Sequence, residues 1–316
     1  MADPVPETTD TDNTDTDTDI GGGWHSAARR RAGTPRRAAA AAGRARLRGG
    51  VSLVLLGLLA LVALLVPWLG DAAGQQVDYA AVLRPPSPAH PFGTDGSGHD
   101  LFVRASAGLR VSLLVATACA LASTVLGAAV GALAGAVGGW LDRLLMRLVD
   151  TVNAVPHLLL GIVIVALFRG SLGAVVVSIA ATHWTTVARI VRAEVLSLRS
   201  RPFLDAAISG GSSRARVLRR HLLPAVVPQA ALSAVLLLPH AVWHETALSF
   251  LGLGLPPHLP SLGNILGESR RAVLLGAWWV VALPSALLVL ATLATSGLAA
   301  GWRDRLVPRR RSELAL

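Results

Sequence analysis

The sequence predicts an all-α membrane protein with six transmembrane helices, and three observations support that prediction. Apolar residues make up 53% of the chain, and its mean hydropathy is +0.55, above that of an ordinary soluble domain. These residues gather into runs that are long enough to cross a bilayer as helices. Charged residues separate the runs, and each of the 29 basic residues is an arginine.

The first 50 residues are predicted to form a cytoplasmic tail. Residues 1–28 are acidic and repetitive, so they offer little apolar surface to bury and we expect them to be disordered. Residues 29–50 hold eight arginines and resemble the start of a signal peptide. However, the apolar run at 51–69 would form a helix about 28 Å long, and no clear cleavage site follows it. We therefore expect 51–69 to be retained as the first transmembrane helix.

Residues 70–108 are polar and rich in proline and glycine, which predicts an extracytoplasmic segment. A transmembrane domain is expected over 109–302, followed by a cytoplasmic tail at 303–316. A short inner loop is expected around Asp142 and Arg147. The five spans of this domain are expected at 111–141, 151–168, 172–188, 226–248 and 276–300.

Two features inside the spans allow a local prediction. Pro156 is expected to be tolerated as a kink in the third span. Gly127, Gly131 and Gly135 predict close helix packing in the second span. The alternative is that these glycines line a path for a substrate.

The placement of arginine predicts that both termini are cytoplasmic. With the N-terminus inside, 23 of the 29 arginines fall in inner segments and six in outer segments. The reverse topology would invert this ratio, against the excess of basic residues in cytoplasmic loops. Trp68, Trp140 and Trp302 lie near span ends, as expected for aromatic belts at the membrane interface.

An arginine-rich break at 192–224 separates the fourth span from the fifth. Its arginines would each be costly at the bilayer centre, so we expect the segment outside the membrane, on the cytoplasmic side. Residues 205–207 lie on an expected short helix, 210–211 offer a turn, and a second amphipathic run ends at Pro224. A helix, a glycine turn and a helix at a membrane surface suggest a docking element for a soluble partner.

This break resembles the cytoplasmic loop in permease subunits of binding-protein-dependent ABC importers. The family pattern is E-A-A, three residues, G, nine residues, a hydrophobic residue, any residue and L-P. The spacing matches, with Asp205 in place of Glu and His221 in place of an aliphatic residue. A basic residue before H-x-L-P is common in the dipeptide, oligopeptide and nickel branch. The matching residues are Asp205, Ala206, Ala207, Gly211, His221, Leu223 and Pro224.

Two further segments resemble the same branch. Residues 90–100 read HPFGTDGSGHD, similar to its H-P-x-G-T-D-x-x-G-R-D, with His99 in place of Arg. Residues 247–254 read ALSFLGLG and look like the segment after its fifth helix. The resemblance covers roughly residues 88–308.

The resemblance implies a permease subunit, multi-pass in a bacterial plasma membrane, that moves short peptides inward by alternating access. It implies two ABC ATPase subunits that hold ATP and Mg, a second homologous permease and an extracellular solute-binding protein. Import of nickel or a metal chelate is the alternative. In the loop, Asp205 would cap or pair within an ATPase cleft. Ala206 and Ala207 would allow close approach, and Gly211 would permit the turn.

Other classes of function fit the sequence poorly. A P-loop needs a lysine on the phosphates, and the chain has none, so we expect no ATPase activity and no cofactor. The arginines flank apolar spans instead of lining one face, which argues against nucleic acid. A passive channel would more often show a repeated pore motif, and an intramembrane enzyme needs a buried nucleophile and base. Neither feature is found, so we expect no catalytic residue.

His240, His244 and Glu245 lie within about one helical turn in the fifth span and are candidate pathway or gate residues. Ionisable groups inside a membrane tend to face a cavity. A packed polar pair and a metal site suited to nickel are the alternatives, and we expect no metal. His157 and His183 are expected to be ordinary structural histidines.

Overall fold

The computed structural model describes residues 35–69, 77–168 and 170–306, and all regular elements within these ranges are helical. The chain divides into two compact units, Met1–Arg44 and Ala45–Leu316, and the fold below concerns the second. The elements are α2 (Pro35–Leu69), η1 (Tyr79–Ala81), α4 (Leu101–Val137), α5 (Gly139–Ala154), α6 (His157–Leu167), α7 (Leu172–Arg199), α8 (Pro202–Ser209), α9 (Arg214–Val217), η2 (Leu218–Leu222), α10 (Leu223–Phe250), α11 (Leu262–Glu268), α12 (Arg270–Leu274) and α13 (Trp279–Leu306).

Five helices in the described part of the chain are long and apolar enough to cross a membrane. They are α2, α4, α7, α10 with η2, and α13. The pair α5 and α6 would make a sixth span, but the chain bends by 86° between them. The prediction of an all-α membrane protein is therefore confirmed, with five or six spans.

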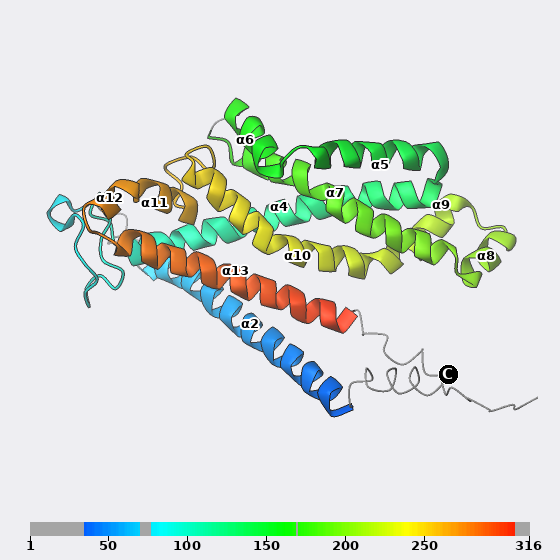
Figure 1. Cartoon of the computed structure of the whole chain (residues 1–316), viewed down its shortest axis with the longest axis horizontal. Helices are drawn as coiled ribbons and strands as arrows, with labels where there is room; N and C mark the ends of the chain where they lie inside the picture. The colour runs from blue at the N-terminus through cyan, green and yellow to red at the C-terminus, as the bar shows by residue number, and fades with distance from the viewer. Residues whose placement is uncertain (1–34, 70–76, 169, 307–316) are drawn as a thin grey trace, which may run out of the picture. The chain divides into compact units, whose positions relative to one another are not determined.

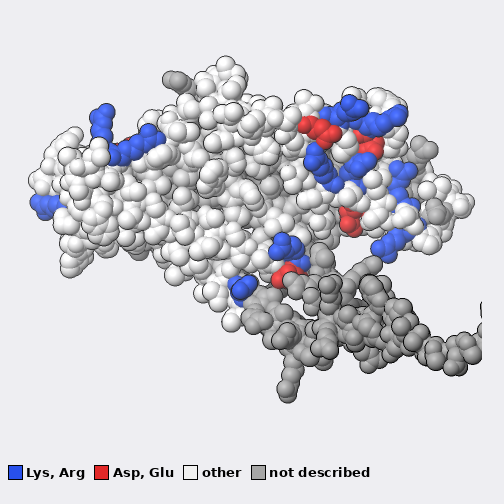
Figure 2. Space-filling model, in the orientation of Figure 1, with Lys and Arg blue, Asp and Glu red and all other residues white. Residues whose placement is uncertain are grey.

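The long helices of the second unit run side by side (Figure 1). The short helices α8 and α9 lie at one end of this bundle, and α11 and α12 lie at the other. We call these the α8 end and the α11 end. Figure 2 shows basic side chains gathered at the α8 end and fewer at the α11 end, with a belt free of charge between them on the face drawn. Such a belt is what a membrane-spanning bundle requires.

Glycines on α4 allow its close approach to α7, which confirms the prediction that Gly127, Gly131 and Gly135 serve close helix packing. A Cβ atom added at Gly131 would lie 2.4 Å from the carbonyl oxygen of Ala188. A Cβ added at Gly127 would lie 2.5 Å from the carbonyl oxygen of Trp184, and Gly135 faces Val195 in the same way. The three glycines recur every fourth residue, so they form one face that lets two backbones approach.

Several helices extend beyond the limits predicted from hydropathy. Residues 35–50 were assigned to the tail but are helical, while 1–34 and 307–316 lie outside the described residues. Similarly, α4 begins at Leu101 because the Asp100 carboxylate accepts from the amides of Phe102 and Val103 at 2.9 and 3.1 Å. Arginine and alanine favour helix, so helices continue past the end of the apolar run.

The predicted inner loop at Asp142 and Arg147 is wrong, because both residues lie in the amphipathic helix α5. The Asp142 carboxylate accepts from Nε and Nη2 of Arg192 at 2.5 and 2.7 Å, which holds α5 to α7. Pro156 does not kink a continuous span; it is the N-cap of α6 at the 86° bend. Proline disfavours helical geometry in the residue before it, so the helix stops there.

Candidate functional site

The segment from α8 to α9 forms a helix, a turn and a second helix at the α8 end. Pro202 starts α8, a position where its missing N–H costs nothing. The amide of Ser212 donates to the carbonyl of Ala207 at 3.1 Å, and that of Gly211 donates to Ile208 at 2.9 Å. This pair of bonds is a Schellman motif, and Gly211 occupies its left-handed position with φ +83°.

Apolar side chains fix this segment to the bundle. Leu204 of α8, Val217 of α9 and Leu222 of η2 are buried in one cluster with Val191 and Val195 of α7. Because α8 and α9 are short, this anchoring and not intrinsic helix stability must hold them. The segment from α8 to η2 therefore shares one apolar cluster with α7.

The outer face of α8 is apolar and uncovered. Phe203 is 50% exposed and Ile208 is 56% exposed, and Ala206 lies on the surface beside them. The side chain of Asp205 is outside the described set, so its expected cap or pairing stays a prediction. These exposed apolar residues make the outer face of α8 a candidate surface for binding a partner.

The other residues of the predicted loop lie where the second helix begins. The His221 ring lies 6.2 Å from the ring of Phe203, measured between centroids. Leu223 and Pro224 are exposed in the first turn of α10. Proline has no N–H and crowds the carbonyl four residues earlier, so Pro224 would interrupt a regular α-helix. The turn before it, η2, is a wider π-helix, which lets the helix continue past Pro224.

At the α11 end, the segment before α4 is tied down by charged groups. Arg104 bridges the carboxylates of Asp95 at 2.6 Å and Glu268 at 2.7 Å. Burial alone would raise the pKa of the Asp95 carboxyl. The charge of Arg104 and the backbone amides of Ser97 and His99 have a larger, opposite effect, so the pKa of Asp95 lies below its ordinary value. His99 itself contacts the Asp95 carboxylate at 3.1 Å.

Four histidines from three helices meet within the spans. We call this group the histidine cluster: His157 of α6, His183 of α7, and His240 and His244 of α10. The His183 ring is central, with centroid distances of 5.4 Å to His157, 4.8 Å to His244 and 6.5 Å to His240. The expectation that His157 and His183 are isolated structural residues missed this convergence.

The three predicted pathway residues separate onto two sides of α10. His240 is exposed and His244 is half-buried, both beside His183. Glu245 is fully buried on the other side, where one of its carboxyl oxygens accepts from the Ser249 hydroxyl at 2.9 Å. Its second oxygen has no hydrogen-bond partner among the described residues.

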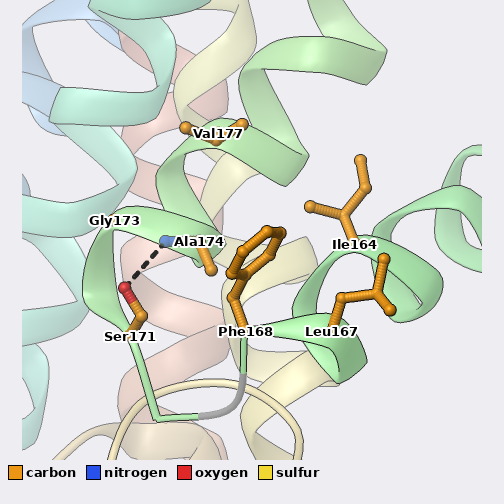
Figure 3. Close-up of a pocket in the computed structure, with 7 residues that line it drawn as sticks. All are labelled: Ile164, Leu167, Phe168, Ser171, Gly173, Ala174 and Val177. Atoms are coloured by element: carbon orange, nitrogen blue, oxygen red, sulfur yellow. Dashed lines mark hydrogen bonds between the residues drawn. The ribbon is translucent and has the colours of Figure 1, made fainter.

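A separate pocket lies where α6 turns into α7. Its volume is about 630 Å³. The Ser171 hydroxyl, its most polar group, caps α7 by accepting from the Ala174 amide at 3.3 Å (Figure 3). The remaining lining is apolar, so the pocket offers no group for chemistry. Its residues are Ile164, Leu167, Phe168, Ser171, Gly173, Ala174 and Val177.

Comparisons with known proteins agree with the resemblance. The profile of the family described as "Binding-protein-dependent transport system inner membrane component" matches residues 127–312. The chain is 39% identical over 262 residues to the oligopeptide transport system permease protein OppC of Escherichia coli K12, across 82% of this chain and 86% of that protein. It is 40% identical over 262 residues to OppC of Salmonella typhimurium, with the same coverage.

Proposed function

Because the chain belongs to the family of binding-protein-dependent transport system inner membrane components, we propose that it is the permease subunit of an ABC importer for short peptides. The names of the related OppC proteins support an oligopeptide substrate over the nickel or metal-chelate alternative. The passive channel and the intramembrane enzyme have no comparable support.

The segment from α8 to α9 is the observation that supports this function most directly. A soluble ATPase needs a rigid projection that it can hold, and α8 offers exposed Phe203 and Ile208 above a buried Leu204. Closure of the ATPases would push on α8 and, through the shared cluster, on α7. The membrane helices would then switch between outward and inward access as a two-state rearrangement.

The remaining partners follow from the same proposal. Two ABC ATPase subunits would dock at the α8 end and hold ATP and Mg, so this chain would be non-catalytic. A second homologous permease would complete the pathway, and a solute-binding protein would deliver the peptide at the α11 end. In this arrangement the α8 end is cytoplasmic, in the plasma membrane of a bacterium.

Docking can be tested with a single charge on the exposed face of α8. Phe203→Asp is expected to abolish co-purification of the ATPase subunits and peptide uptake, because a carboxylate would be desolvated in an apolar contact. The matched control is Leu274→Asp, the same kind of change at an 87% exposed leucine of α12. Co-purification of the ATPases should persist in the control. Retention of the ATPases by the Phe203→Asp variant would contradict the docking role of α8.

A further inference from the structure

One side of the histidine cluster is exposed on the surface of the helix bundle. His240 is exposed and lies in a helix that is apolar enough to span the membrane. Ionisable side chains within spans almost always face a protein interior or a water-filled cavity, because contact with lipid tails is costly. This face of α6, α7 and α10 therefore belongs to the pathway or to the boundary with the second permease.

The hydrogen bonds of the cluster decide what it can bind. Nδ1 of His183 lies 3.0 Å from the carbonyl of Ile179, and Nδ1 of His240 lies 3.2 Å from that of Leu236. A carbonyl oxygen only accepts, so Nδ1 of His240 carries the proton and donates it, whereas Nδ1 of His183 also lies 2.8 Å from the Thr182 hydroxyl, which can donate or accept. A neutral imidazole has one donor and one acceptor, which leaves Nε2 of His240 as an acceptor for a ligand.

Free acceptors select for a ligand that brings donors. A carboxylate offers none, so neutral rings in this tautomer cannot hold it. No group of three or more His, Cys, Asp or Glu in the described ranges converges closely enough to hold a metal ion. An ammonium group has three N–H donors and accepts looser geometry than a metal.

The surroundings of the cluster favour a cation held weakly. The Trp243 ring is 54% exposed and meets the His244 ring edge-on, with 5.3 Å between centroids. An exposed indole attracts cations through its ring face. The neighbouring carboxyl of Glu245 is fully buried and bonded to Ser249, so it does not reach this surface. Neutral acceptors beside an aromatic ring would bind an ammonium without trapping it.

We propose that the histidine cluster and Trp243 contact the amino-terminal ammonium of the peptide as it crosses the membrane. This inference rests on the proposed import of peptides and adds the chemical group that the membrane pathway recognises. His240 and His244 supply contacts that the peptide reaches from the open side, and His183 holds the rings in place from behind.

The test uses the complete importer, with its binding protein, in proteoliposomes. The substrates are trialanine and N-acetyl-trialanine, which differ in the terminal ammonium. One double variant, His240→Leu with His244→Leu, removes the acceptor of His240 and the neighbouring His244 ring at similar volume. A second, His240→Gln with His244→Gln, keeps an acceptor oxygen at each position. Thr117→Val, an exposed polar residue of α4, is the control.

The leucine double variant is expected to raise the KM for trialanine about tenfold, the effect of losing one hydrogen bond to a charged group. The glutamine double variant should recover most of that loss, and the control should behave as wild type. The KM for N-acetyl-trialanine should change less than twofold. If the binding protein rejects that peptide, the difference between the leucine and glutamine variants on trialanine alone decides.

The outcomes separate the two proposals. If the wild-type importer takes up neither peptide while its ATPases hydrolyse ATP, the proposed peptide function fails. If the wild type imports trialanine and the leucine variant matches it, the contact with the ammonium fails. The contact also fails if the leucine and glutamine variants lose uptake equally, because a purely structural role of the rings would then explain the loss. Thermal unfolding of each purified complex confirms that the variants are folded.

Discussion

At the scale of single residues, Gly211 is a position in the loop at 192–224 where backbone geometry limits the choice of side chain. Its φ is +83°, and a Cβ atom added there would meet nothing within 4 Å. Substitution is therefore opposed by the left-handed backbone and not by crowding. A β-branched residue in this region costs about 1–3 kcal/mol, while asparagine tolerates it.

Gly211→Val is accordingly expected to abolish peptide uptake while membrane insertion stays normal, because the turn that presents α8 would be lost. Gly211→Asn should keep most of the uptake. The measurement is uptake of a labelled peptide by cells that express each variant at equal membrane levels. Normal uptake by the valine variant would show that the turn is not needed for coupling.

Residue positions differ in how far the sequence could predict them. The glycine turn at 210–211 was predictable, since the required spacing lies within one short segment. The histidine cluster was not, because His157, His183 and His240 lie on separate helices and meet only when these helices pack. Hydrophobic periodicity reports the faces of one helix and says nothing about which residue of the next helix lies opposite.

At the scale of elements, the contact between α4 and α7 depends on the absence of side chains at three glycines. A Cβ at Gly131 would lie 2.4 Å from the carbonyl oxygen of Ala188, a backbone atom that cannot rotate away. Gly131→Val is expected to destabilise the protein by about 1–3 kcal/mol or more, since overpacking forces the helices apart. Thermal unfolding in detergent, together with the yield of the complex, measures this.

Gly57→Val provides the control for that change. Gly57 lies in α2, where an added Cβ meets nothing within 4 Å, so valine should be tolerated with little change in the unfolding temperature. Equal unfolding temperatures for the two variants would mean that the glycine face of α4 does not determine packing.

Helix packing of this kind was predictable from the spacing of the glycines, and so was a kink at Pro156, but the size of the bend between α5 and α6 was not. The apolar run at 151–168 predicts one span, whereas the structure bends by 86° at Pro156. Beyond the bend, the amphipathic helix α5 is held to α7 by the pair between Asp142 and Arg192. That pair joins residues far apart in the chain, so local hydropathy could not reveal it.

At the scale of the whole molecule, the class and the approximate number of spans followed from composition, because long apolar runs in a chain have few alternatives to membrane helices. The number of spans does not show which end of the bundle faces the cytoplasm. That orientation depends on where the arginines lie relative to the bilayer. The arginines gather at the α8 end, as Figure 2 shows. We therefore predict that the α8 end is cytoplasmic.

Cysteine labelling tests this orientation. Cys119 is the one cysteine of the chain and is buried, so Cys119→Ala gives a background without competing thiols. In that background, Ser97→Cys lies in the segment before α4, and Ser212→Cys lies in the turn after α8. A maleimide that cannot cross the membrane should label position 97 in intact cells and position 212 only after permeabilisation. Labelling of position 212 from outside intact cells would overturn the topology, and with it the docking of ATPases at α8.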